Sequence, residues 1–367
     1  MSDAGAAMAI WQYGDTWAGL PVHWLARPHD PARMTPQERN IWELGGGQQS
    51  TWAEVGAAAP DAAEVAWALS VTYARDLPFA DLFAGFVEAV DTTRVRVLLL
   101  GYWATGLLSE EPPDHAIRVL CAHADRFPAL RSLFVGAIAS EEHEISWIPR
   151  GDVTPVLEAF PQLEELTYRF GQPVRPRGGA QVGGDGTGVL RPVRHARLRR
   201  LTLETGGLPA HVPAVVAACD FPALEHLDLW LGVSFYGGET TVDDLTDLLA
   251  ARNLPRLRHL GLMNSEMQDE VAAAVAGAPV VAQLESLDLS MGSLGDAGAE
   301  ALLAGQPLTH LRKLSLRHHF ISDAMRTRLD AQIASAGVDI DLSDAMDLYE
   351  WLIADGAGDG RYVEVSE

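Results

Sequence analysis

The sequence has few cysteines and no long apolar run. Its 367 residues include two cysteines, Cys121 and Cys219, each embedded in an apolar stretch. Two such thiols provide neither a disulfide framework nor a cysteine zinc site, so we expect them to be buried and reduced. No stretch approaches the roughly eighteen apolar residues of a membrane span, and the N-terminus lacks the pattern of a secretion signal. We therefore expect a soluble, cytoplasmic protein without a membrane partner.

Positive charge is also scarce. Lys and Arg number 27 against 50 Asp and Glu, which gives a formal charge of -23. This balance argues against nucleic acid or anionic lipid as the main partner. The basic stretch RPVRHARLRR, residues 191–200, lacks interleaved aromatic residues, and we expect its arginines mostly to pair with the chain's own carboxylates.

Recognisable catalytic motifs are missing. The acidic stretch EEHEISW, residues 141–147, surrounds His143 but lacks the H-E-x-x-H spacing, and no G-x-S-x-G elbow occurs. The loop expected at residues 171–188 is rich in glycine, but no G-K-[ST] follows it. Scattered Ser, His and Asp residues cannot be assembled into a triad from sequence alone. We expect no enzymatic activity and no cofactor.

What the sequence does contain is a repeated L-x-x-L-x-L pattern. Successive units begin 26 to 35 residues apart, a spacing that overlaps that of leucine-rich repeats and exceeds it in the first half. Weaker forms of the pattern begin at Val95, Leu130 and Leu163, and a last strand is expected in VDIDL, residues 338–342. The first residues of the clear units are Leu198, Leu224, Leu257, Leu284 and Leu311.

Each unit predicts a strand, a turn and a helix. In QLESLDLSMGSLGDAGAEALLAG, residues 283–305, Leu287 and Leu289 alternate with polar residues, as a half-buried strand requires. Asp296 then precedes an alanine-rich run with helical spacing, and we expect it to cap that helix at its N-terminus. Asp269 and Asp323 stand at the same offset in their own units.

These units resemble the leucine-rich-repeat family, and the form GDAGAEALL resembles its ribonuclease-inhibitor-like subclass. The stretches LEHLDLWLG and DGRYVEVSE are also similar to a bacterial family of leucine-rich-repeat proteins without an established activity. The resemblance implies an α/β solenoid shaped like a horseshoe, with a parallel sheet on the concave face and helices on the convex face. We number the positions of a unit by their offset from its first leucine, which is offset 0. At offset 8 the family often has Asn or Cys, whereas this chain has Gly171, Gly206, Gly232, Ser265, Gly292 and His319.

Three regions are expected along the chain. Residues 1–60 contain half of the ten tryptophans, and we interpret them as an extension that covers the first edge of the repeats, with a partner-binding tail as the alternative. The solenoid spans residues 61–342. Residues 343–367 are acidic and predict a solvated tail.

The outward strand positions suggest the function. Offsets 2, 4 and 6 of neighbouring units form columns because parallel strands lie about 4.8 Å apart. We expect a non-catalytic module that binds a protein or peptide through this face. The alternative is a metal-binding accessory protein or metal-dependent enzyme that uses His226, Asp228, His259 and Asp288. The expected partner-binding residues are Arg200, Glu204, His226, Asp228, Trp230, Phe235, Tyr236, His259, Met263, Asp288, Lys313 and Arg317.

Overall fold

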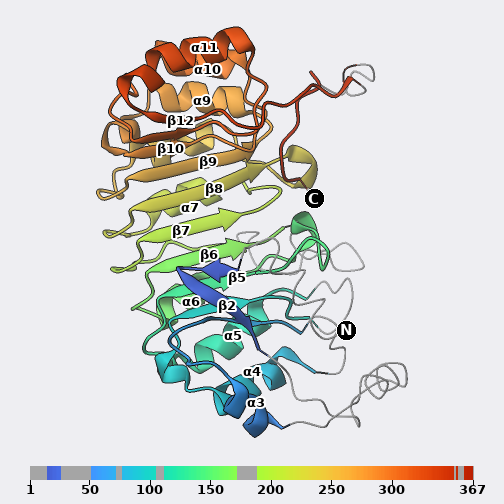
Figure 1. Cartoon of the computed structure of the whole chain (residues 1–367). Coiled ribbons are helices and arrows are strands. Elements are labelled where there is room, and N and C mark those ends of the chain that lie inside the picture. The colour runs from blue at the N-terminus through green and yellow to red at the C-terminus, as the bar shows by residue number, and fades with distance from the viewer. Residues whose placement is uncertain are drawn as a thin grey trace.

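The computed structural model describes residues 15–25, 51–71, 77–104, 111–171, 188–350, 353 and 359–366. Twelve strands form one sheet whose spatial order follows the order of the sequence (Figure 1). Only the first pair is antiparallel; every later pair is parallel. The chain is thus an α/β protein with a mostly parallel sheet, compatible with a repeat solenoid. Among the described residues, no helix has both the length and the apolar character needed to cross a bilayer.

The strands are short, with two to seven residues each. They are β1 (Thr16–Trp17), β2 (Leu20–Trp24), β3 (Ala66–Leu69), β4 (Val97–Leu100), β5 (Ser132–Val135), β6 (Glu165–Arg169), β7 (Arg200–Glu204), β8 (His226–Gly232), β9 (His259–Ser265), β10 (Ser286–Asp288), β11 (Lys313–Ser315) and β12 (Asp339–Asp341).

The helices follow the strands along the chain and pack against one face of the sheet. They are α3 (Trp52–Ala58), α4 (Phe79–Ala89), α5 (Asp114–Ala122), α6 (Thr154–Ala159), α7 (Val212–Ala218), α8 (Thr246–Ala250), α9 (Gln268–Ala276), α10 (Asp296–Ala304) and α11 (Asp323–Gln332). We call the opposite face of the sheet the helix-free face.

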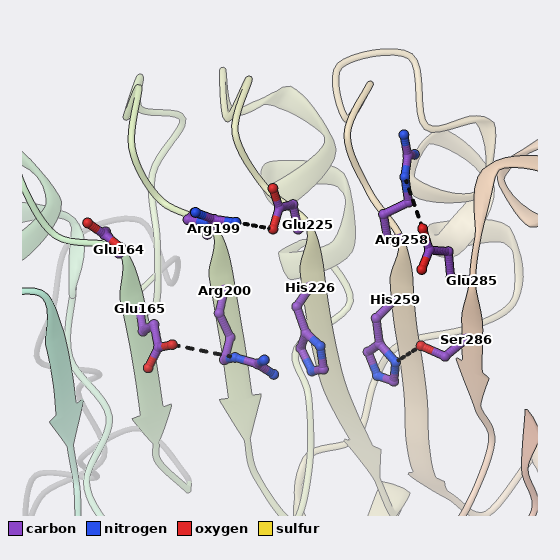
Figure 2. A pocket seen from close by; sticks show the side chains of 10 residues that line it. All are labelled: Glu164, Glu165, Arg199, Arg200, Glu225, His226, Arg258, His259, Glu285 and Ser286. Carbon is purple, nitrogen blue, oxygen red and sulfur yellow. Dashed lines mark hydrogen bonds and ion pairs between the residues drawn. The ribbon is translucent and has the colours of Figure 1, made fainter. Parts of the chain in front are cut away.

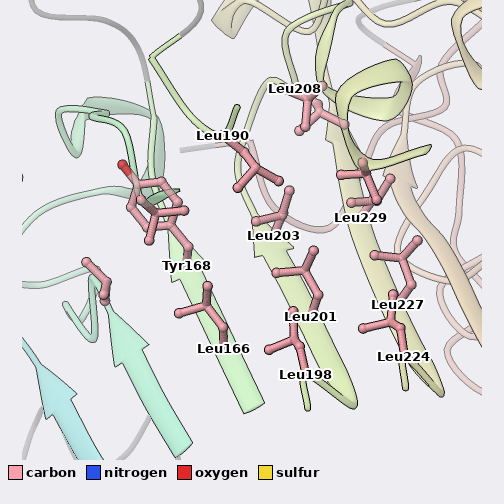
Figure 3. Close-up of a cluster of buried hydrophobic side chains, with 14 of the residues drawn as sticks. Leu166, Tyr168, Leu190, Leu198, Leu201, Leu203, Leu208, Leu224, Leu227 and Leu229 are labelled. Carbon is pink, nitrogen blue, oxygen red and sulfur yellow. The ribbon is translucent and has the colours of Figure 1, made fainter. Parts of the chain in front are cut away.

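The repeated leucines form one continuous core between the sheet and the helices (Figure 3). Leu260, Leu287 and Leu314 are register partners on β9, β10 and β11, and each is buried. The prediction that the first leucine of each clear unit lies at an equivalent interior position is confirmed. These buried leucines are Leu224, Leu257, Leu284 and Leu311.

Two of the three aspartates at the shared offset, Asp269 and Asp296, stabilise the neighbouring unit, whereas Asp323 pairs with Arg326 of its own helix. The carboxylate of Asp269 accepts hydrogen bonds from the backbone N–H of Gly295 and Gly298, at the start of α10 (2.8 and 2.9 Å). Asp296 accepts from the backbone N–H and the hydroxyl of Ser322, the N-cap of α11 (2.8 Å each). Asp296 is already inside α10, so the prediction that it caps this helix is wrong. The spacing of the units brings each carboxylate to the next helix N-terminus, where unpaired N–H groups need acceptors.

Buried polar side chains satisfy the turns at offset 8, where an asparagine ladder is missing. Gln268 is fully buried; it donates to the carbonyl of Leu262 (2.8 Å) and accepts from the backbone N–H of Ser265 (3.2 Å). The buried ring of His319 accepts at Nδ1 from the N–H of Ile321 and bonds through Nε2 to the carbonyl of Leu342. Because buried backbone groups must be paired, these side chains supply the partners that the turns need.

The N-terminal hairpin covers part of the helix-free face. β2 pairs with β3 and extends the edge of the sheet, while the ring of Trp17 in β1 lies 4.7 Å from that of Phe134 in β5. In Figure 1 this hairpin, in blue, crosses in front of the sheet. The hairpin and the outward side chains of β3–β5 form a second apolar cluster. Trp11 and Trp42 lie outside the described residues, as does the glycine-rich stretch 172–187.

The C-terminal segment 359–366, which we expected in solvent, contacts the turns that follow β9, β10 and β11. Arg361 forms an ion pair with Asp269 (2.6 Å), and Asn264 accepts from the backbone N–H of Val365 (3.0 Å). Glu364 pairs with Arg317. Despite its acidic composition, this segment is therefore attached to the repeats by the side chains of Arg361 and Glu364 and by its backbone.

Replacing Leu287 by Ala should lower the free energy of unfolding by about 2–5 kcal/mol, because the truncation leaves a cavity in a fully packed core. Chemical denaturation provides the measurement. Lys313→Ala, at an exposed position of the adjacent strand, is the control and should change stability little. Equal stability of the two variants would contradict the inward placement of Leu287.

Candidate functional site

The helix-free face contains a shallow polar hollow of about 490 Å³ over the amino-terminal halves of β6–β10 (Figure 2). Its lining comes from offsets 1 and 2 of five consecutive units, which the register aligns in two columns. Unlike the face of β3–β5, this part lies beyond the N-terminal hairpin. The lining residues are Glu164, Glu165, Arg199, Arg200, Glu225, His226, Arg258, His259, Glu285 and Ser286.

Two histidines and an aspartate meet at the centre of this region. His226 and His259 are register partners on β8 and β9, and their rings stack with centroids 3.8 Å apart. Nε2 of His226 lies 2.6 Å from Oδ2 of Asp228, and Nε2 of His259 lies 2.9 Å from Oδ1 of the same carboxylate. Nδ1 of His259 lies 2.6 Å from the hydroxyl oxygen of Ser286. The lateral contact of the two histidines, predicted from the column pattern, is confirmed.

A glycine makes the space for this arrangement. Gly261 is the register partner of Asp228, so any side chain on Gly261 would occupy the region between β8 and His259. A Cβ atom at Gly261 would lie 2.2 Å from Oδ1 of Asp228, far inside van der Waals contact. The carboxylate therefore leans across the glycine to reach His259 on the neighbouring strand.

Partial burial and mutual hydrogen bonding set the charges of the cluster. Burial lowers the pKa of His226, which favours its neutral form, although the bond to Asp228 opposes this shift. Burial alone would raise the pKa of Asp228, but the hydrogen bonds from His226 and His259 hold it well below its usual range. The carboxylate is thus ionised and can accept one N–H from each ring.

An alternating row of charges borders the hollow at offset 1. Arg199 pairs with Glu225 (2.7 Å), and Glu285 pairs with both Arg258 (3.8 Å) and Arg312 (3.3 Å). The sign alternates through seven successive units. The row is Arg131, Glu164, Arg199, Glu225, Arg258, Glu285 and Arg312. Sequence reasoning missed it because only offsets 2, 4 and 6 were considered, although the alternation is visible in the letters that follow each first leucine.

The arginine-rich stretch 191–200 contributes to such pairs, as expected. Arg191 pairs with Asp152 (2.7 Å) and Arg194 with Asp220 (3.3 Å). Arg199 belongs to the alternating row. This stretch is therefore largely neutralised within the chain.

An apolar pair lies on the same face, toward the carboxyl ends of the strands. Trp230 and Met263 are register partners and both are half-buried. The ring of Phe235 is 82% exposed and packs edge-on against Tyr236, which in turn meets Trp147. Within the described residues, no aromatic contact joins Trp230 to either ring of this loop. Tyr236 thus links the loop to Trp147.

The other predicted partner-binding residues divide into accessible and engaged positions. Arg200 and Lys313 are exposed. Glu204, at the carboxyl end of β7, is buried and pairs with Arg169 (2.8 Å). Arg317 binds Asp344 and Glu364, so it anchors the C-terminal segment.

Asp288, part of the alternative metal-ligand set, accepts a hydrogen bond from the backbone N–H of Ser290 (2.9 Å). The ligand atoms that lie close together belong to His226, Asp228 and His259.

Comparison with known proteins supports the fold only. A crystal structure of a Bacteroides fragilis protein, a target of the Northeast Structural Genomics Consortium, is similar with a TM-score of 0.63 and 27% sequence identity. The similarity covers 76% of this chain and 70% of that one. No protein-family model and no curated protein matches the chain.

Replacing Gly261 by Ala should displace the carboxylate of Asp228 from His259 and destabilise the chain by about 1–3 kcal/mol through the lost charged hydrogen bond. Nitrogen NMR of the histidine rings should show a changed environment for Nε2 of His259. Gly277→Ala is the matched control, since a Cβ atom there meets open space. Unchanged His259 ring signals in the Gly261 variant would contradict the role of the glycine.

Proposed function

We propose that the chain is a leucine-rich-repeat protein of the ribonuclease-inhibitor-like subclass, with the helix-free face as the concave surface of a horseshoe. We further propose that it is a non-catalytic module that binds a protein or peptide partner in the cytoplasm. The repeated strand and helix units and the aligned leucines support the first proposal.

The observation that carries the binding proposal is the position of Trp230 beside Met263. The leucines on either side of Trp230 already fill the core, so its indole contributes to the outer face of the sheet. In the neighbouring loop, the ring of Tyr236 packs edge-on against Trp147. An aromatic ring beside a methionine, with charged groups nearby, has the composition of an interface hot spot.

The chain's own N-terminal hairpin provides a precedent for binding on this face. Trp17, Leu20 and Val22 pack against outward residues of β3–β5, which include Phe134 and several small side chains. The face of β7–β11 lies beyond that hairpin. A partner segment placed there would contact Trp230 and Met263 on one side and the polar hollow on the other.

Replacing Trp230 by Ala should weaken partner binding by about 2 kcal/mol, or roughly thirtyfold, with little change in folding stability. The measurement compares the proteins retained from native lysate by wild-type and variant baits, quantified by mass spectrometry. Met263→Ala should reduce retention of the same protein.

Trp147→Ala is the matched control, because this residue is 54% exposed but lies in the segment between β5 and α6 and not on a strand. A protein retained by the wild type and by this control, and lost from Trp230→Ala, supports the proposal. Equal retention by all baits would exclude the sheet face as the binding surface.

A further inference from the structure

The cluster of His226, Asp228 and His259 has a ligand set that a binding face alone does not require. We propose that these three residues form a binding site for a divalent transition-metal ion, with coordination positions left open toward the polar hollow. One potential ligand atom from each residue lies within 4.8 Å of the other two. This inference is independent of the partner proposal, because it rests on ligand geometry and chemistry.

The positions of the ligands are fixed by the sheet and not by a loop. His226 and Asp228 project from alternate positions of β8, while His259 projects from the register partner of His226 on β9. Gly261 leaves the space through which the carboxylate reaches the second strand. Two rigid strands thus bring two imidazoles and one carboxylate to one point.

The surroundings of His259 match those of a metal ligand. Histidine ligands usually use their second ring nitrogen in a hydrogen bond that fixes the ring. Nδ1 of His259 makes such a bond with the hydroxyl of Ser286 at 2.6 Å, which directs Nε2 toward Asp228. On metal binding, Nδ1–H would donate to this hydroxyl while Nε2 coordinates the ion.

The charge of the region also suits a dication. Four glutamates and three arginines line the hollow, and Asp228 adds a fifth carboxylate beside it, so acidic side chains outnumber the arginines by two. A divalent ion would neutralise this excess. The side chains of the three ligands are 16 to 21% exposed, which leaves them in reach of an ion in solution.

Binding requires a small rearrangement of the hydrogen-bonded cluster. Ligand atoms around a tetrahedral ion with bonds of about 2.0–2.1 Å lie about 3.3 Å apart, so the present nitrogen-to-oxygen distances of 2.6 and 2.9 Å must widen slightly. The stacked rings must also turn out of parallel, because an imidazole binds metal in its own plane. Both changes are side-chain rotations above a fixed sheet.

The ligand chemistry selects the class of ion. Imidazole suits zinc, copper, nickel and iron, whereas calcium and magnesium prefer oxygen ligands throughout. Two imidazoles and one carboxylate with open positions form the set found in sites where water or substrate completes the coordination. Zn²⁺ is therefore the first probe, and Mg²⁺ the negative comparison.

The test is a calorimetric titration with ZnCl₂. The full chain is purified without a histidine tag and stripped of metal with EDTA beforehand. We expect one Zn²⁺ per chain and no binding of Mg²⁺. His226→Gln and His259→Gln should each abolish stoichiometric binding, and Ser286→Ala should weaken it about 10–100-fold as the loss of a supporting hydrogen bond does. His115→Gln, on helix α5, is the control and should bind as the wild type does.

A second measurement covers the case in which a variant fails to fold. In the wild type, one equivalent of Zn²⁺ should shift the NMR ring signals of His226 and His259 and leave those of His115 unchanged. Absence of one-equivalent binding to the wild type would overturn the proposal. So would binding that persists unchanged in both folded histidine variants or that shifts other histidine rings instead.

Discussion

The buried leucines of successive strands are aligned, and this alignment determines where the other side chains of the sheet lie. Leu227 on β8 lies beside Leu260 on β9, and Leu287 on β10 continues the row. Each leucine fills the space between the sheet and its helix, and a shift by one residue would expose the whole set. The register of every outward side chain is therefore determined by the inward face.

That register explains why a cluster of polar residues can form without a dedicated loop. His226 and His259 meet because both directly precede an inward leucine at the same position of their units. Asp228 reaches the second histidine because the next strand has Gly261 at the corresponding position. The spacing of the units also produces contacts between successive helices. Asp269 and Asp296 each bind the N-terminus of the following helix.

The sequence predicted the periodic parts of the molecule and missed contacts that depend on distant segments. The spacing of Leu224, Leu257 and Leu284 was sufficient to predict the strands, their parallel order and the proximity of the two histidines. The packing of Trp17 on Phe134 was not predictable, because no periodicity links the N-terminal hairpin to β5. The attachment of Arg361 to Asp269 was likewise hidden, since 92 residues separate the two and the surrounding composition is acidic.

We infer that the aligned units, and not a loop, build a metal-binding site on the helix-free face. X-ray diffraction from crystals soaked in Zn²⁺, recorded on both sides of the zinc absorption edge, tests this inference. We expect one strong anomalous peak bonded to Nε2 of His226, Nε2 of His259 and a carboxylate oxygen of Asp228. Crystals in which this cluster keeps its hydrogen bonds, with zinc bound elsewhere or not at all, would contradict it.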